Sequence, residues 1–166
     1  MEPPRIVEFP GKEVSGVRLR MSHGGDRTSE LWRGFRSRLA EASLQLVAAY
    51  SIRLYDESYS FSTFDKGAEF DKWAAVDSNL NPELSESLER LFVPPGRYAV
   101  FVHKGTAMDA PRTFRYIFGV WLPASNFEVD SRPHFEILPP GYDPFDPRTE
   151  EEVWLPIRER QEASTL

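Results

Sequence analysis

Two periodicities alternate along the chain, and together they predict strands and helices in a repeated order. Val17, Leu19 and Met21 alternate with Arg18 and Arg20. This alternation predicts a strand over residues 12–21, because successive strand side chains face opposite sides of a sheet. Similar alternation predicts further strands over residues 50–56, 72–78, 97–104, 133–138 and 151–157.

In two segments between these strands, apolar residues recur at helical spacing and predict helices. The first helix is expected to begin at Thr28 or Ser29, either of which is a favoured N-cap. Its apolar face contains Leu31, Trp32, Phe35, Leu39 and Ala42. The second helix is expected to begin at Asp109, with Pro111 in its first turn and Pro123 at its end. Its apolar face contains Phe114, Ile117, Phe118 and Trp121.

Each half of the chain therefore has the order strand, helix, strand, strand. We predict an α+β fold built from two such units related by a pseudo-two-fold axis, with an antiparallel sheet, two helices on one face and a ligand cleft. We expect a single domain over residues 1–166, with halves over about 5–78 and 92–158 and a flexible tail over 159–166. Residues 79–91 join the halves and are expected to contain a helical turn near 85–91.

The strand residues separate into two predicted faces. One face, expected under the helices, is mostly aliphatic and contains Val17, Leu19, Ile52, Leu54, Val76, Val100, Val102, Phe135, Ile137, Val153, Leu155 and Ile157. The other face contains Tyr55, Trp73, Phe101, His103, His134, Glu136, Glu152 and Trp154. Large aromatic side chains with a few polar groups are typical of a small-molecule pocket. A carboxylate among aromatic rings also suits an organic cation, although a single aromatic residue on a strand more often packs in the core than contacts a ligand.

Composition narrows the classes of function. The 166 residues carry a net charge of −6 and no cysteine, which argues against direct nucleic-acid binding and excludes thiolate chemistry and disulfides. Only two of the three histidines, His103 and His134, are expected on one face, whereas a zinc site needs three or four convergent ligands. No glycine-rich phosphate loop occurs, so we expect neither a metal nor a cofactor. No apolar run is long enough for a membrane span and the start lacks a secretory signal, so we expect a cytoplasmic protein.

Four segments resemble a known family. Residues 93–105 read VPPGRYAVFVHKG, residues 116–127 read YIFGVWLPASNF, residues 135–138 read FEIL and residues 152–157 read EVWLPI. In this order and spacing they resemble the GyrI-like small-molecule-binding domains, also called AraC-type effector-binding domains. The likeness extends from about Val7 to Arg158, and Leu138 stands where tyrosine is common in the family.

The resemblance implies a hydrophobic cleft with Glu136 as its central acidic residue and Trp154 as an aromatic wall. Family members bind lipophilic, often cationic, compounds, and many are fused to a helix-turn-helix domain. Because strand signals begin almost at once, we expect a stand-alone member without such a domain, of the multidrug-binding or effector-binding kind.

Three functions remain open at this point. The first is binding of lipophilic or cationic small molecules, and the expected ligand-binding residues are Glu136, Trp154, Tyr55, Trp73, Phe101, Trp121, Leu138 and Glu152. The second is hydrolysis of reactive small molecules, for which the resemblance implies a tyrosine–glutamate pair and Glu136 and Tyr55 are the candidates. The third is interaction with a protein partner such as DNA gyrase.

Overall fold

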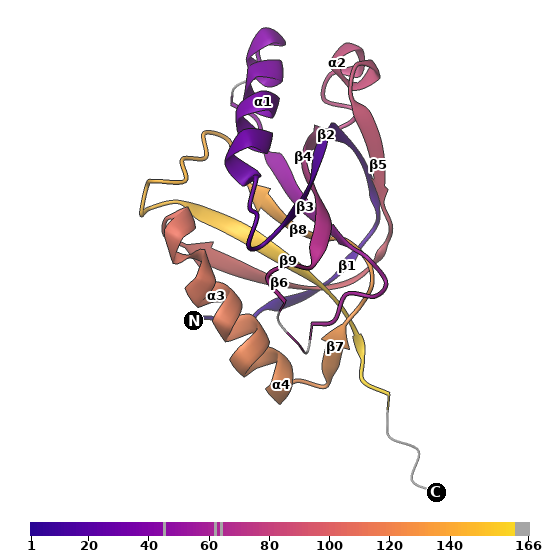
Figure 1. Cartoon of the computed structure of the whole chain (residues 1–166), viewed down its shortest axis with the longest axis vertical. Helices are drawn as coiled ribbons and strands as arrows, with labels where there is room; N and C mark the ends of the chain where they lie inside the picture. Colours follow the sequence, from indigo (N-terminus) through magenta and orange to yellow (C-terminus); the bar gives the residue numbers. More distant parts are fainter. Residues whose placement is uncertain (45, 62, 64, 162–166) are drawn as a thin grey trace, which may run out of the picture.

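The computed structural model describes residues 1–44, 46–61, 63 and 65–161 of the chain. Its dominant feature is one antiparallel sheet in the order β1-β6-β9-β8-β3-β4-β2-β5, with β7 paired to β9 (Figure 1). The strands are β1 (Arg5–Phe9), β2 (Lys12–Ser22), β3 (Ala49–Tyr55), β4 (Glu69–Asp77), β5 (Glu89–Val93), β6 (Gly96–Lys104), β7 (Phe127–Val129), β8 (His134–Leu138) and β9 (Glu150–Glu159).

Two long helical segments lie on this sheet, one in each half of the chain. The first is α1 (Thr28–Glu41). The second runs through η1 (Ala107–Asp109), α3 (Ala110–Tyr116), η2 (Ile117–Trp121) and α4 (Leu122–Ala124). A short helix, α2 (Pro82–Glu86), precedes β5. Within the described residues, no helix has the length and apolar character needed to cross a membrane.

The predicted fold class is confirmed, and the predicted strands and helices are present with small changes in their bounds. The predictions missed β1, β5 and β7, which are short and carry charged residues among their apolar ones. The joining turn begins at Pro82, earlier than expected, because the Asn81 side chain accepts a hydrogen bond from the Leu84 N–H and caps α2. At the other end, β9 continues to Glu159 through its pairing with β7, so the tail begins later than predicted, and residues 162–166 lie outside the described part.

The two halves exchange their leading strands. β1 precedes β2 in the sequence but pairs with β6, whereas β5 precedes β6 but pairs with β2. Each half therefore completes the sheet of the other. The halves meet where β3 pairs with β8, and Glu136 lies opposite Ser51 at the middle of that ladder. The topology thus places Glu136 at the centre of the pseudo-symmetric sheet.

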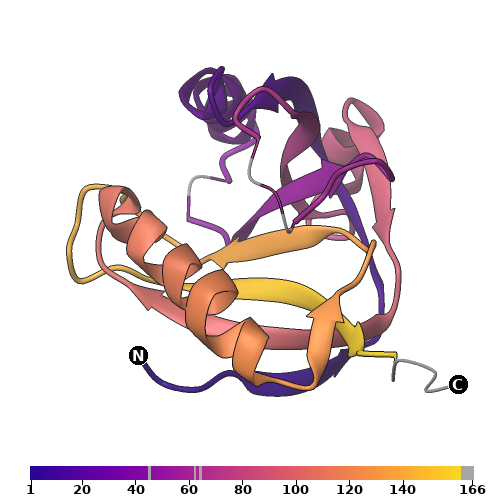
Figure 2. The same ribbon diagram turned by 60° about the horizontal axis from the view of Figure 1, so that its bottom comes forward.

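Both faces of the sheet are largely buried. On one face α1 covers a cluster that includes Met21 and Phe70, and the second helical segment covers a cluster that includes Phe101 and Val153 (Figures 1 and 2). The opposite face carries a third cluster, in which side chains from different strands of the sheet pack against one another. Its buried members are Phe9, Val14, Ile52, Trp73, Ala75, Val93, Tyr98, Val100, Phe135 and Trp154.

The predicted division into faces is therefore wrong in two ways. First, Glu136 and Tyr55 lie on the helix-bearing face, which was expected to be the plain aliphatic one. Second, Ile52, Val100 and Phe135, which were expected under the helices, lie on the opposite face together with Trp73 and Trp154. The physical reason is that aromatic and aliphatic residues are needed on both faces when both are buried, so side-chain type does not indicate which face the helices cover.

Candidate functional site

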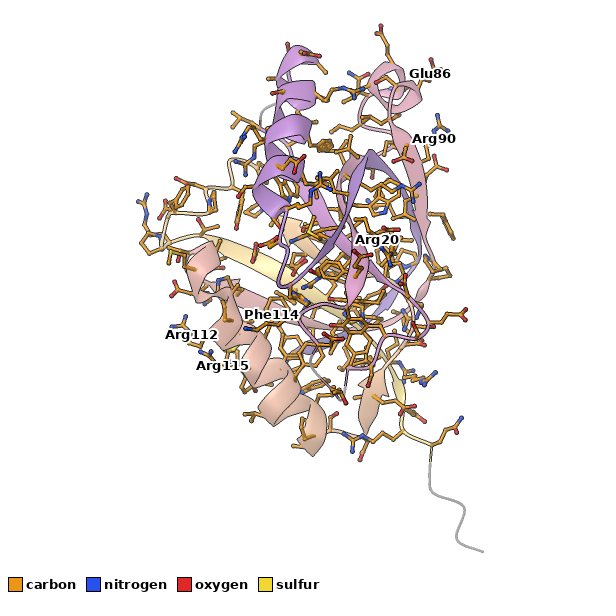
Figure 3. The ribbon with its side chains drawn as sticks, in the orientation of Figure 1. Arg20, Glu86, Arg90, Arg112, Phe114 and Arg115 are labelled. Atoms are coloured by element: carbon orange, nitrogen blue, oxygen red, sulfur yellow. The ribbon has the colours of Figure 1, made fainter. Side chains whose placement is uncertain are left out.

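A small cavity lies between the helix-bearing face of the sheet and the second helical segment. Its volume is about 20 Å³, which is room for about one water molecule. We call it the central cavity. It is lined by Arg53, Tyr55, Phe114, Ile117, Phe118, His134, Val153, Trp154 and Leu155. In Figure 3, Phe114 points from α3 toward the sheet, whereas Arg112 and Arg115 point away from it. The η2 segment, which supplies Ile117 and Phe118, is a π-helical turn, a local form that is frequent at functional sites.

An ion pair between Arg53 and Glu136 lies beside the central cavity. The Arg53 Nη2 donates to Glu136 Oε1 at 2.7 Å, and the two side chains are only 12% and 11% exposed. The Arg53 guanidinium also lies over the Phe114 ring, 5.0 Å from its centroid. Arg53 therefore already occupies a place that combines a carboxylate with an aromatic face, the two features that attract an organic cation.

This ion pair is incompletely satisfied. Within the described part of the chain, neither Arg53 Nε nor Glu136 Oε2 has a hydrogen-bond partner, although both atoms are buried. An arginine fork and a carboxylate commonly form two parallel hydrogen bonds, and here only one is made. Buried polar atoms left without a partner are costly, so the site retains one strong donor and one acceptor for a bound group.

A second, partly buried basic side chain lies next to Arg53. Lys72 on β4 is directly opposite Arg53 on β3, and its Nζ donates to Thr28 Oγ1 at 2.9 Å. Burial and the positive charge of Arg53 lower the pKa of Lys72 below its ordinary value. Thr28 in turn donates to the Asp26 carboxylate at 2.5 Å. Arg27, which precedes α1, makes no side-chain cap, so the expected N-cap hydroxyl of Thr28 instead links the start of α1 to Lys72.

A second, partly buried carboxyl group belongs to Glu151 on β9, the strand that pairs with β8. Burial, reinforced by the charge of Glu136, raises the pKa of Glu151 to about 7. Tyr142 lies close to Glu151, and burial together with the charge of Glu151 raises the pKa of Tyr142 above its ordinary value. Tyr142 belongs to the proline-rich segment between β8 and β9, so that segment is in contact with the site.

Two aromatic side chains from the segment after β3 cover the site. This aromatic cover consists of Tyr59 and Phe61. The Phe61 ring stacks on His134, with centroids 5.0 Å apart, and Tyr59 packs on Tyr55 at 4.4 Å. Phe61 also lies parallel to Phe118 at 6.3 Å, and is 37% exposed. Burial and the charge of Arg53 hold the pKa of His134 well below its usual value, so the His134 ring that lines the cavity is uncharged.

The structure brings together only some of the residues predicted for the site. Glu136 and Tyr55 lie beside the central cavity, and Leu138 is buried on the same face at the end of β8. Phe101 and Trp121 pack on each other at 5.1 Å in the core under the second helical segment.

The remaining predicted residues lie on the opposite face. Trp154 borders the cavity, but its ring stacks on Phe135. Trp73 is buried in the same cluster, and Glu152 pairs with Arg5 at 2.6 Å.

Several site residues were missed by sequence reasoning. Arg53 is a basic residue on an otherwise apolar strand, and Glu151 belongs to a run of three glutamates. Both patterns are usually explained by solvent exposure. His103, which was predicted on the face away from the helices, is a buried structural residue whose ring contacts Thr113 Oγ1 and the Thr106 carbonyl. The residues that the structure describes contain no group of three or more potential ligands that could hold a metal ion.

The fold and the site together define a duplicated strand–helix–strand–strand domain with a buried charged centre under an aromatic wall. Residues 2–158 match the GyrI-like small molecule binding domain. The chain belongs to this family.

Known relatives agree with this assignment. The transcriptional regulator BrlR of Pseudomonas aeruginosa is 29% identical over 154 residues, which are 92% of this chain and 54% of BrlR. The chain thus spans about half the length of that relative.

Solved structures share the fold at low sequence identity. SAV2435 bound to tetraphenylphosphonium has a TM-score of 0.65 at 16% identity, covering 95% of this chain and 94% of that one. A hydrolase from Listeria innocua has a TM-score of 0.59 at 11% identity, covering 94% and 92%.

Proposed function

We propose that this chain binds lipophilic small molecules at the central cavity, with aromatic side chains as walls and the Arg53–Glu136 pair as the polar anchor. The observation that carries the proposal is the buried, half-satisfied ion pair, which lies against Phe114 at the centre of the sheet. A purely structural pair would be expected to complete its hydrogen bonds. The family match and the cation bound to SAV2435 support the same assignment.

Binding a ligand of ordinary size requires the cavity to expand. A volume of about 20 Å³ holds one water molecule, whereas pockets for drug-sized ligands measure roughly 300–1,000 Å³. The aromatic cover is the part best placed to move, because Phe61 is partly exposed and is held by ring contacts to His134 and Phe118. Displacing it exposes Tyr55 and His134 as further ligand surface.

A cationic ligand can use Glu136 only by displacing Arg53. The cation would then take over both interactions that Arg53 makes, the carboxylate contact and the Phe114 face. We therefore propose two components of recognition. The aromatic walls hold the lipophilic body of any ligand, and the ion pair discriminates between polar head groups.

The proposal is tested by fluorescence titration with the neutral lipophilic dye Nile red and the lipophilic cation rhodamine 6G. Phe114→Ala is expected to weaken binding of both dyes by about tenfold or more, because a buried aromatic contact contributes on the order of 1–3 kcal/mol. Phe145→Ala is the matched control, since Phe145 is 79% exposed in the segment before β9. Absence of saturable binding of either dye, or equal weakening by both variants, would contradict the proposed function.

A second candidate function is hydrolysis of the bound molecule. It is favoured by Glu151, whose pKa is raised to about 7 by burial beside Glu136, because a carboxyl group that titrates near neutral pH suits acid–base catalysis. Glu136 and Tyr55 were the candidates predicted from the sequence. Mass spectrometry of each bound dye over hours separates the two functions. An unchanged dye supports binding alone, and a product that disappears in Glu151→Gln or Glu136→Gln supports hydrolysis.

A further inference from the structure

Arg53 sits where a ligand cation would have to sit. Its guanidinium is paired with Glu136 at 2.7 Å and lies 5.0 Å from the Phe114 centroid, and it lines the central cavity itself. Glu136 is absent from that lining, so Arg53, and not Glu136, is the charged side chain that the polar head group of a ligand would contact. A molecule entering the cavity therefore meets a cation, with the carboxylate behind it.

A second basic side chain lies beside Arg53. Lys72 lies directly opposite Arg53 on the neighbouring strand, and Glu136 already has one oxygen committed to Arg53. Of the polar atoms on Arg53, Nε is buried and has no partner among the described residues. Nε is a charged donor, and a buried charged donor is best satisfied by an oxygen acceptor.

We propose that Arg53 determines the ligand class of this site, selecting lipophilic molecules that carry an oxygen acceptor, such as a carboxamide or a carboxylate, over lipophilic organic cations. The acceptor oxygen binds Arg53 Nε without breaking the Arg53–Glu136 pair. An organic cation, by contrast, must first expel Arg53 from its carboxylate and its aromatic face. This inference rests on the proposed function and adds the chemistry of the head group to it.

The test uses three molecules of the same shape that differ only in their head group: 4-phenylbenzamide, 4-phenylbenzoate and 4-phenylbenzamidine. Isothermal titration calorimetry gives the Kd of each. For the unaltered protein we expect the amide and the carboxylate to bind at least about tenfold more tightly than the amidinium, since a hydrogen bond to a buried charged group contributes roughly 10- to 100-fold in affinity. Tighter binding of the amidinium would overturn the inference.

The decisive variant is Arg53→Leu, which removes the resident cation and leaves Glu136 free. We expect the order of affinities to reverse, with the amidinium gaining at least about tenfold and the amide losing at least about tenfold. Arg53→Leu/Glu136→Gln, which keeps no buried charge at this pair, is expected to bind all three molecules within about threefold of one another. If Arg53→Leu does not fold, the double variant is the test. Loss of the preference for the amide and the carboxylate in the double variant then supports the inference, and retention of that preference overturns it.

Arg18→Leu is the matched control. Arg18 also pairs with carboxylates and lies over an aromatic ring, that of Trp73 at 5.8 Å, but on the opposite face of the sheet. We expect it to leave the order of affinities unchanged, and a reversal in Arg18→Leu would overturn the assignment to Arg53. If Nile red binds but the three head groups are not discriminated, the inference fails while the proposed function stands. If neither Nile red nor any of the three binds, both fail.

Discussion

Removing one partner of the Arg53–Glu136 pair should lower the free energy of unfolding far more than replacing both partners with apolar residues. In Glu136→Leu the Arg53 guanidinium loses its 2.7 Å carboxylate contact while remaining 12% exposed. Leaving one buried charge unpaired typically costs about 3–5 kcal/mol, whereas replacing both partners with apolar residues is often nearly neutral. We therefore expect Glu136→Leu and Arg53→Leu each to destabilise the protein by about 3–5 kcal/mol, and the double variant to lose less than either single variant.

The assay is urea denaturation followed by intrinsic tryptophan fluorescence, with the four proteins forming a double-mutant cycle. For a chain of this size each kcal/mol corresponds to about 2–4 °C in Tm, so the single variants should melt about 6–20 °C lower. Arg5 and Glu152 provide the control cycle, because their contact is as short, 2.6 Å, but the side chains are 55% and 34% exposed. That pair should couple by less than about 1 kcal/mol. Additive losses at Arg53 and Glu136 would show that the two charges do not stabilise each other.

Three further predictions concern the rest of the site. Burial raises the pKa of Glu151 to about 7, so the folded state binds more protons than the unfolded state between about pH 4.5 and 7, and stability falls as pH rises through that window. Glu151→Gln should remove this decline, which Tm measured from about pH 5 to about pH 8 would reveal. Phe61→Ala should accelerate Nile red dissociation at least about threefold in stopped-flow measurements, because Phe61 stacks on His134, and an unchanged rate would exclude it as a cover. Trp73→Phe should leave dye affinity within about twofold, since Trp73 belongs to the opposite face, and a larger loss would contradict the observed faces.

The order of elements was predictable because local periodicity encodes it. The alternation at Val17, Leu19 and Met21 reappears as β2, and the helical spacing from Leu31 to Leu39 reappears as α1. Short strands such as β5 were not predictable, since five residues that begin with two charged ones give little periodic signal. β5 is formed by its pairing with β2, a long-range contact that its own sequence does not specify.

The candidate site was only partly predictable. The family resemblance implied Glu136 as the central acidic residue of a cleft; in the structure Glu136 lies at the middle of the β3–β8 ladder, beside the central cavity but outside its lining. The residues around it were not found, because Arg53, Lys72 and Glu151 carry charges that ordinarily indicate solvent exposure. Their burial follows from the helices and the loop segments that cover this face, which are tertiary features. The aromatic residues predicted for a single face are divided between both, with Phe101 under the helices and Trp73 and Trp154 opposite, since both faces of the sheet are buried.

The most direct test of the account is a crystal structure of the protein saturated with Nile red. The account predicts the dye on the helix-bearing face, in contact with Phe114 and Arg53, with Phe61 displaced from its stack on His134. A dye bound against Trp73 and Trp154 on the opposite face, or saturating binding that leaves the central cavity closed, would contradict it.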